Sequence, residues 1–266
     1  MTTTIYDGLK RVVGSDSRWS CFAENVNGDF RVCSHSKATH IVYVDDTGFG
    51  KILLRQDIVL CLAGNGGLIE QWKRWWRAHS LVKNYPPFTT ASGDYVALYA
   101  VDLKTNEMYP LSNQIDCSYV DPNTRQVKAL FSGSGGAIAF QAWCATMNVI
   151  TSIKFAISYD CCSGGGVRFI DYAAKQQDLE DSFHTMLEVK DKLITGGFVM
   201  DLNIRNAMPI TDAQFDSLRQ DLSAQISAIG APLAPTTQVV WDESAFARLD
   251  ALVDLVAARE EESTEF

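Results

Sequence analysis

The order of strand and helix patterns along the chain restricts its fold more than any other feature of the sequence. Two short runs of β-forming residues, 2–6 and 11–16, flank Asp7-Gly8, a dipeptide that suits a tight hairpin turn. Further strand patterns lie at 41–44, 58–62, 95–101, 127–131 and 166–172, and helical patterns lie at 68–79, 136–147 and 150–159. The two kinds of element do not alternate as a parallel βαβ fold requires. We therefore expect an α+β fold, with antiparallel sheets covered by helices.

The C-terminal part of the chain has a different character. Beyond about residue 174 the sequence becomes polar and helix-forming, so we expect a main domain over 1–200 and a helical C-terminal extension over 201–266. A capping box at Thr211 starts an amphipathic helix for which Gly230 is a plausible stop, and a second amphipathic segment covers 241–259. The prolines of 231–235 mark a connector between them. Each apolar face must be buried, either on the chain's own core or on a neighbouring subunit.

Composition argues against several classes of partner. A net charge of -9 repels phosphate backbones, so we expect no nucleic-acid partner. No apolar run approaches the roughly 18 residues that span a bilayer, so no membrane partner is expected either. The chain begins without the pattern of a secretory signal, and its seven cysteines are irregularly spaced. These features favour reduced thiols and a cytoplasmic location.

The second residue has the chemistry of a nucleophile. Removal of Met1 would leave Thr2 as the first residue, with no longer propeptide to cleave. An N-terminal threonine can attack through its hydroxyl while its own α-amine accepts the proton. An α-amine with a pKa of about 7.7 to 8.0 is already partly neutral at neutral pH, unlike a lysine near 10.4. A Met-Thr start alone is common and does not identify an enzyme.

Four separated motifs, in order, resemble those of proteasome β subunits and of the bacterial HslV peptidase, which are N-terminal-nucleophile (Ntn) hydrolases. They are Thr-Thr-Thr-Ile at 2–5 with Asp-Ser-Arg at 16–18, Lys-Ile-Leu-Leu at 51–54 with Ala-Gly-Asn-Gly-Gly at 63–67, Gly-Ser-Gly at 133–135, and Asp-Cys-Cys-Ser-Gly-Gly at 160–165. The resemblance covers about the first 170 residues. It implies an αββα sandwich, in which two antiparallel sheets lie between helical layers.

The resemblance also implies roles for individual residues. Thr2 is the nucleophile, Lys51 is the active-site lysine that Asp16 orients, and Gly64 occupies the oxyanion-hole position. Positions around the threonine amine correspond to Ser134, Asp160 and Ser163, and positions that contact substrate correspond to Trp19, Ser20 and Leu62. The chain is a couple of residues shorter than the family between Thr2 and Asp16, and much longer between Arg18 and Lys51, which leaves Lys37 as a rival lysine.

Other reactive or aromatic residues have simpler interpretations. Cys33, His35 and His40 lack a second pair that would complete a metal site, so we expect no metal and no cofactor. Adjacent side chains diverge, so Cys161 and Cys162 are expected to be buried thiols. Leu68, Trp72 and Trp75 form a core stripe at helical spacing, with the basic residues at 73, 74 and 77 on the solvated face.

The function that these residues predict is a threonine-type peptidase or amidohydrolase that forms an acyl-enzyme through Thr2. The resemblance further implies a homo-oligomer, with ring assembly, a polypeptide substrate and an ATPase unfoldase as partner. The alternative is a catalytically silent protein of the same fold that serves as a structural or assembly component, for example of a phage or mobile element. Retention of Thr2, Asp16 and Lys51 favours the enzyme.

Overall fold

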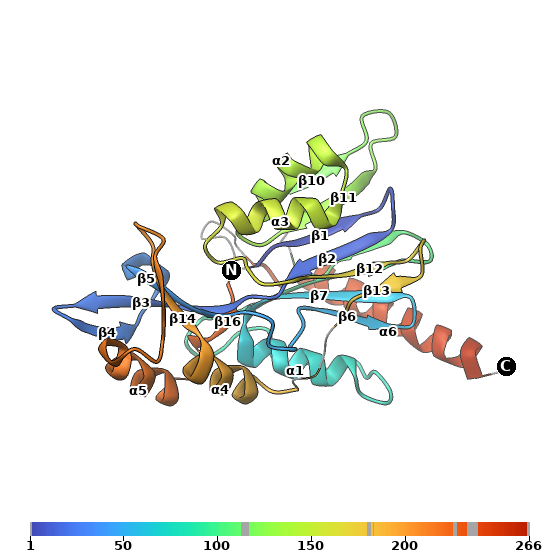
Figure 1. Ribbon diagram of the computed structural model, residues 1–266. Coiled ribbons are helices and arrows are strands. Elements are labelled where there is room, and N and C mark those ends of the chain that lie inside the picture. Colours follow the sequence, from blue (N-terminus) through green and yellow to red (C-terminus); the bar gives the residue numbers. More distant parts are fainter. Residues whose placement is uncertain are drawn as a thin grey trace.

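The computed structural model describes residues 2–112, 117–179, 182, 184–225, 228–232 and 239–264. It is a mixed α and β structure with two antiparallel sheets and, in the described residues, six α-helices, as the α+β prediction requires. Figure 1 shows the sheets stacked between helices above and helices below. The layers therefore run helices, sheet, sheet, helices.

The first sheet is built around the N-terminal hairpin. Its six strands lie in the order β10 (Cys117–Val120), β11 (Val127–Ser132), β1 (Thr4–Asp7), β2 (Val12–Asp16), β12 (Val167–Asp171) and β13 (Gln176–Gln177). The hairpin turn is held by Asp7, whose carboxylate accepts from the backbone N–H of Leu9 at 3.0 Å and of Lys10 at 3.3 Å. Helices α2 (Gly136–Thr146) and α3 (Val149–Tyr159) cover the outer face of this sheet.

The second sheet is larger. Its main path runs β15 (Ala207–Pro209), β14 (Phe198–Asp201), β5 (His40–Val44), β3 (Trp19–Val26), β16 (Gly230–Ala231), β7 (Ile58–Asn65), β8 (Val96–Asp102) and β9 (Glu107–Pro110). Two further strands join it, β4 (Asp29–Val32) beside β3 and β6 (Ile52–Arg55) beside β7. Its outer face packs against α1 (Gly66–Trp76), α4 (Met186–Gly196), α5 (Asp216–Ala224) and α6 (Glu243–Thr264).

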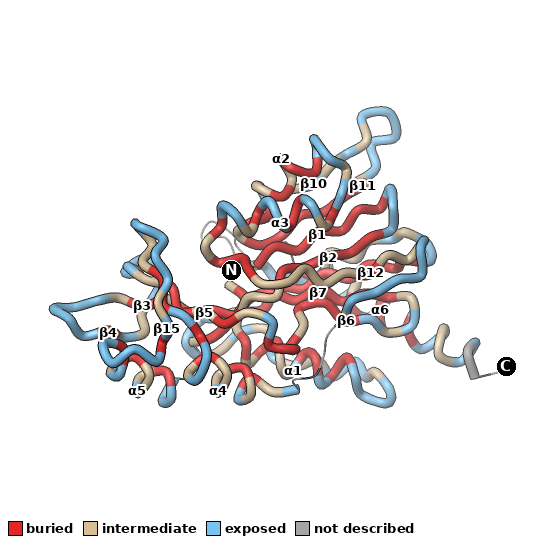
Figure 2. Tube along the Cα trace, in the orientation of Figure 1, coloured by how far each residue is buried: buried red, intermediate tan, exposed pale blue. Residues whose placement is uncertain are grey.

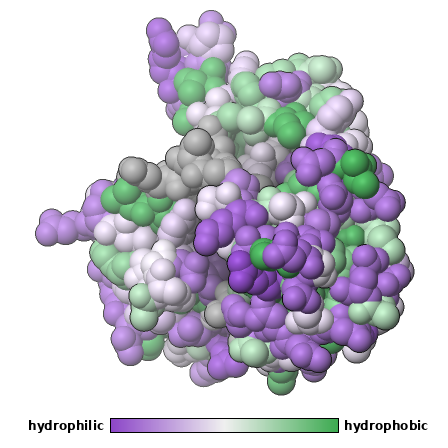
Figure 3. All heavy atoms as spheres, turned by 90° about the vertical axis from the view of Figure 1, so that its left-hand side faces the viewer, coloured by the Kyte–Doolittle hydropathy of each residue, from purple (hydrophilic) through white to green (hydrophobic). Residues whose placement is uncertain are grey.

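Apolar side chains separate the layers into clusters. Tyr6 and Val13 of the first sheet meet Val59 and Tyr99 of the second, so this cluster is the interface between the sheets. Figure 2 shows buried residues concentrated in the strands and on the inner sides of the helices, with exposed loops around them. The end of the molecule that faces the viewer in Figure 3 is largely hydrophilic, with hydrophobic residues in small separate groups.

The C-terminal segment differs from the expected pair of helices. The helix predicted over 211–230 is replaced by a 3-10 turn, η2 (Ala213–Phe215), and by α5, which ends at Ala224. Gly230 does not stop a helix; it lies in β16, inside the large sheet. The second helix is present as α6, and its apolar residues Leu249 and Leu252 pack on the chain's own core. Much of the proline-rich connector lies outside the described residues.

The helix α1 corrects a second expectation. Trp72 and Trp75 are buried as predicted, and Trp76 is buried too, but Lys73 between them is also buried rather than solvated. Its Nζ donates to the carbonyl of Gly50 at 2.9 Å and lies 3.5 Å from the ring centre of Phe49. None of the helices in the described part of the chain is both long and apolar enough to span a bilayer.

Candidate active site

The carboxylate of Asp16 is the centre of the candidate site. Its Oδ1 accepts three hydrogen bonds, from the hydroxyl of Thr2 at 2.7 Å, from the backbone N–H of Thr3 at 2.8 Å and from Nζ of Lys51 at 2.9 Å. Its Oδ2 accepts from the backbone N–H of Arg18 at 3.2 Å and of Gly164 at 3.0 Å. Asp16 ends β2, and the N–H of Asp16 donates to the carbonyl of Thr3 at 3.1 Å, so the hairpin itself brings these groups together.

Lys51 reaches Asp16 from the second sheet. It precedes β6, and its carbonyl accepts from the N–H of Leu62 in β7 at 2.9 Å, which fixes the backbone. The side chains of Lys51 and Asp16 are both fully buried. Burial lowers the pKa of Lys51 below its ordinary value, although Asp16 favours the charged form and opposes the shift. The rival Lys37 lies exposed in the 3-10 turn η1 (His35–Lys37), away from this ion pair.

A second polar chain lies beside Thr3. The hydroxyls of Thr3 and Ser163 are 2.7 Å apart, and Ser163 also donates to Oδ2 of Asp160 at 2.7 Å. Ser134 donates to the same oxygen of Asp160. Ser163 and Asp160 are buried, so these hydroxyls and the carboxylate form a connected network rather than separate surface groups. The three residues predicted to surround the threonine amine are thus brought together, with Thr3 as their direct neighbour in the N-terminal strand.

Two glycines allow the N-terminal strand to approach this network. A Cβ at Gly133, which has a φ of +86°, would lie 1.8 Å from the carbonyl oxygen of Thr2. A Cβ at Gly135 would lie 1.9 Å from the hydroxyl oxygen of Thr3. Contacts this short are impossible, so the Gly-Ser-Gly motif is required by the backbone packing at this site.

Arg18 braces the opposite side of Asp16. Its guanidinium makes a bidentate pair with Asp45, with both N–O distances 2.8 Å, and donates to the carbonyl of Cys161 at 2.8 Å. It also lies 3.6 Å from the ring centre of Tyr43. A Cβ at Gly164 would lie 2.2 Å from this guanidinium, so the glycine is needed here too. Thr3 and Gly164 lie inside the motifs found in the sequence but were assigned no role there, because they act through contacts across the fold. Asp45 was missed, because it lies in a loop without a motif.

The residues predicted to bind substrate are arranged less simply. Gly64, with a φ of +112°, pairs with Val96 on one side and with Ala231 of β16 on the other. Ser20 of β3 is fully buried and pairs with Gly230, which also belongs to β16. The backbone positions predicted to contact a substrate are therefore paired with the chain's own C-terminal segment.

The other two expected substrate contacts are core residues in this structure. The side chain of Trp19 is buried, and its indole N–H donates to the carbonyl of Phe49 at 2.8 Å. Leu62 is buried in the same apolar cluster. Both side chains point into the layer between the large sheet and its helices, so they do not line an open substrate pocket here.

The candidate nucleophile is enclosed. Thr2 is 0% exposed, and the cavity beside Asp16 and Lys51 has a volume of only about 10 Å³. Met1 and its removal lie outside the described residues.

The cysteine pair departs from its expectation. The sulfur atoms of Cys161 and Cys162 are 3.6 Å apart and do not diverge. A hydrogen bond from Cys162 lowers the pKa of Cys161 to about 7, although burial opposes the shift, while the pKa of Cys162 is raised. With Asp160 they form the one cluster of metal-ligand side chains found in the described part of the chain. Asp160 is already engaged by two serines, so we assign the cluster to the hydrogen-bond network.

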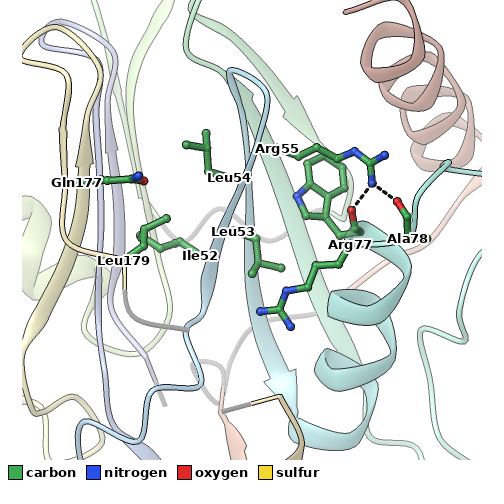
Figure 4. Close-up of a pocket in the computed structure, with 9 residues that line it drawn as sticks. Ile52, Leu53, Leu54, Arg55, Arg77, Ala78, Gln177 and Leu179 are labelled. Atoms are coloured by element: carbon green, nitrogen blue, oxygen red, sulfur yellow. Dashed lines mark hydrogen bonds between the residues drawn. The ribbon is translucent and has the colours of Figure 1, made fainter. Parts of the chain in front are cut away.

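A larger open cavity runs along β6, and no serine, threonine or cysteine is among the residues that line it. It has a volume of about 540 Å³ and is lined on one side by Gln177 and Leu179 and on the other by Arg55. Figure 4 shows Arg55 turned away from Gln177, toward the end of α1. There Arg55 donates to the carbonyls of Trp76 and Ala78, at 2.5 and 2.7 Å. The arginine holds structure together rather than offering a free charge.

Comparisons with known proteins add little to this geometry. Neither a protein family nor a curated protein matches the sequence. Among solved structures, the chain is similar to Thiobacillus denitrificans BPH in complex with epoxomicin, at 13% sequence identity and a TM-score of 0.31. The match covers 64% of this chain and 96% of that one. A likeness at this TM-score does not indicate a function for the chain.

Proposed function

We propose that the chain is an Ntn hydrolase of the threonine type, with Thr2 as its nucleophile once Met1 has been removed. The observation that carries the proposal is the shared hydrogen bonding at Asp16, whose Oδ1 accepts from both the Thr2 hydroxyl and Lys51. A buried threonine, lysine and aspartate held together in this way at a chain terminus serve no evident need of stability, because burying such an ion pair costs as much as it returns.

The reaction follows from the groups present. The Thr2 hydroxyl oxygen adds to the carbonyl carbon of an amide, and its proton passes to the free α-amine. The same proton is then delivered to the leaving amine as the C–N bond breaks, which leaves an ester on Thr2. Water, deprotonated by the α-amine, hydrolyses that ester. In this scheme Lys51 stabilises negative charge on the threonine oxygen, and the N–H of Gly64 stabilises the oxyanion.

The surrounding network has a positioning role in this proposal. The chain of hydroxyls from Thr3 through Ser163 to Asp160 holds the first strand against the Gly-Ser-Gly turn. That contact sets where the α-amine of Thr2 lies, one residue earlier. The proposed substrate is a polypeptide, and the proposed assembly is a homo-oligomer, with an ATPase unfoldase as a further partner for folded substrates.

Substitution at the first two threonines tests the proposal. Thr2→Ala should remain folded and lose all hydrolysis of a fluorogenic peptide, because only Thr2 combines a hydroxyl with a free amine. Thr3→Ala is the matched control and should keep partial activity, since it loses one network hydroxyl and no reacting group. Full turnover by Thr2→Ala would exclude this nucleophile.

The second candidate, a silent structural protein, is favoured by one observation. Thr2 and Lys51 are buried, and β16 fills the space between β3 and β7. The same measurement separates the candidates, because a structural protein shows no peptide hydrolysis that depends on Thr2. The closed site has a second explanation, however, which the position of β16 suggests.

A further inference from the structure

The short strand β16 lies inside the large sheet, between two much longer strands. It has two residues, Gly230 and Ala231, and lies between β3 and β7, which have eight residues each. It pairs antiparallel to both, with Gly230 opposite Ser20 and Asn65, and with Ala231 opposite Gly64. Two strands that are both antiparallel to a third run parallel to each other. Without β16, therefore, β3 and β7 would face one another across a gap one strand wide.

We propose that residues 228–232 are a built-in inhibitor: they occupy the gap between β3 and β7, where the family resemblance implies substrate contacts, and an extended peptide enters only by displacing them. Open strand edges bind extended peptides through backbone hydrogen bonds, and side-chain pockets add specificity. The edges of the gap include Ser20, which the resemblance implies as a substrate contact, and Gly64, which it places at the oxyanion hole. The proposal rests on the proposed function only for what happens to the bound peptide at Thr2.

The direction of β16 connects the gap to the candidate nucleophile. Because β16 runs antiparallel to β3, a chain that continues in its direction moves toward the beginning of β3. β3 begins at Trp19, three residues after Asp16, which holds Thr2. A peptide bound in the orientation of β16 would thus lead its C-terminal side toward the Thr2 hydroxyl. The internal segment blocks that path.

The contacts of residues 228–232 indicate which peptide sequence fits the gap between β3 and β7. The carbonyl of Ile229 accepts from the N–H of Gly66 at 3.1 Å, and the Ile229 side chain is buried in the core cluster. A Cβ added at Gly230 would lie 2.5 Å from the carbonyl oxygen of Gly64, so no larger residue fits. Ala231 is also fully buried. The gap should accept an apolar residue followed by two small ones.

Space for a longer ligand adjoins the segment. A cavity of about 890 Å³ is bounded by Gly64 and Asn65, by Ile229 and Gly230, and by the loop that carries Tyr95. A peptide that replaces β16 could extend into this volume, which the chain's own residues 228–230 border. The short pairing and the adjoining space both favour exchange.

Gly230→Val tests the proposal, because the added methyl groups cannot pass the carbonyl of Gly64. The Gly66 amide should exchange its hydrogen at least about tenfold faster in this variant, since its partner Ile229 is displaced. Gly196→Val is the matched control, because a Cβ at Gly196 meets no atom within 4 Å. It should exchange like the unchanged protein. If Gly230→Val does not fold, Gly230→Ala has the same Cβ conflict and carries the same test.

The second readout is binding of a labelled peptide Ala-Ile-Gly-Ala-Pro, the sequence of 228–232, followed by fluorescence anisotropy. A tethered segment competes at an effective concentration on the order of millimolar, so the peptide should bind Gly230→Val at least about tenfold more tightly than the unchanged protein. Ala-Ile-Val-Ala-Pro should not bind. No binding to a folded Gly230→Val whose Gly66 amide exchanges faster would overturn the proposal, as would unchanged exchange in that variant.

This test is independent of hydrolysis. Adding Thr2→Ala to Gly230→Val should leave binding of this peptide unchanged, because residues 228–232 pair with β3 and β7 and not with Thr2. If Thr2 is the nucleophile, Gly230→Val with Thr2 intact should also hydrolyse short peptides several-fold faster than the unchanged protein. Binding without hydrolysis would contradict the proposed function and leave the role of residues 228–232 standing.

Discussion

Asp16 connects the two sheets through one oxygen atom, which accepts from Thr2 in the first sheet's N-terminal segment and from Lys51 beside the second. Its hydrogen bonds hold the two segments together, and under the proposed function it also orients the reactive groups. The buried lysine would remain without a counter-charge if Asp16 were removed, so the reactive role is tested better at Lys51. The structure leaves Lys37, the other lysine considered, exposed to solvent.

Replacing Lys51 should therefore affect the reaction, and replacing Lys37 should not. Lys51→Met keeps most of the side-chain volume and removes the charge beside the Thr2 hydroxyl. We expect peptide hydrolysis to fall by about a hundredfold or more, as for the loss of other electrostatic stabilisers. The measurement is kcat/KM on protein shown to be folded by circular dichroism. An equal loss in Lys37→Met would contradict this assignment.

Lys73 predicts a pH dependence of stability. Burial, and then repulsion by Arg77, lowers the pKa of Lys73 to about 6, although Glu70 opposes the shift. Unfolded lysine keeps its proton up to a pH of about 10.4, so between these values folding releases a proton. The free energy of unfolding contributed by this group should accordingly rise with pH from about 6 to about 10. Folding is penalised most at the acid end of that range.

Lys73→Met removes this dependence and should flatten the rise. Urea unfolding at several pH values between about 7 and 9 measures the slope, and Lys154→Met, at an exposed position of α3, is the control. An unchanged slope in Lys73→Met would mean that the folded protein keeps Lys73 charged, as the nearby ring of Phe49 would favour.

At the scale of elements, the sequence predicts those that are long or carry turn signals. The N-terminal hairpin, the strand leading into α1 and the pair α2 and α3 all follow from periodicity and from glycine positions. β3 and β4 were overlooked although Asn27-Gly28, both with positive φ, is a strong hairpin signal between them. β16 could not have been predicted, because two residues show no alternation and their pairing is fixed by distant strands.

The same distinction applies to the candidate site. The proximity of Asp16, Lys51 and the serines is expected from motif order, but the sequence does not reveal that Gly230 lies between the strands of Ser20 and Asn65. Nor could it predict that Lys73 turns inward, since a helical wheel places it beside Trp72 and Trp76 without showing what lies opposite. Tertiary contacts of the loop at Phe49 and Gly50 decide that orientation.

The contribution of α6 to the stability of the protein can be measured. Leu252 is fully buried in the cluster shared by α6 and the large sheet, so Leu252→Ala should destabilise the protein by about 2 to 5 kcal/mol. Leu187→Ala makes the same chemical change at a side chain that is 52% exposed in α4, and should cost no more than about 0.5 kcal/mol. Urea unfolding compares them. Equal effects would mean that α6 is not held on the core.

For the whole molecule, the C-terminal segment contributes to the same core as the rest. β15 lies at the edge of the large sheet, β16 lies inside it, and Leu218 and Leu222 of α5 join its apolar cluster. An apolar face buried on its own chain is not free to hold a neighbouring subunit. Any homo-oligomer, which stays a proposal, must then use other surfaces.

Truncation after Asn206 distinguishes these arrangements. The truncated chain loses β15, α5, β16 and α6, so we expect it to unfold or aggregate rather than to form a smaller folded oligomer. Circular dichroism with size-exclusion chromatography and light scattering provides the readout. A folded, monodisperse product of lower oligomeric state would instead assign the segment to assembly.

The central claim, that Thr2 becomes a free N-terminal nucleophile, is tested most directly by mass spectrometry of the purified protein before and after reaction with a peptide epoxyketone. Such an electrophile captures a hydroxyl and an amine on the same residue. The account predicts an intact mass lacking one methionine, and one adduct that maps to Thr2 and disappears in Thr2→Ala. Complete retention of Met1, or an adduct at any other residue, would contradict it.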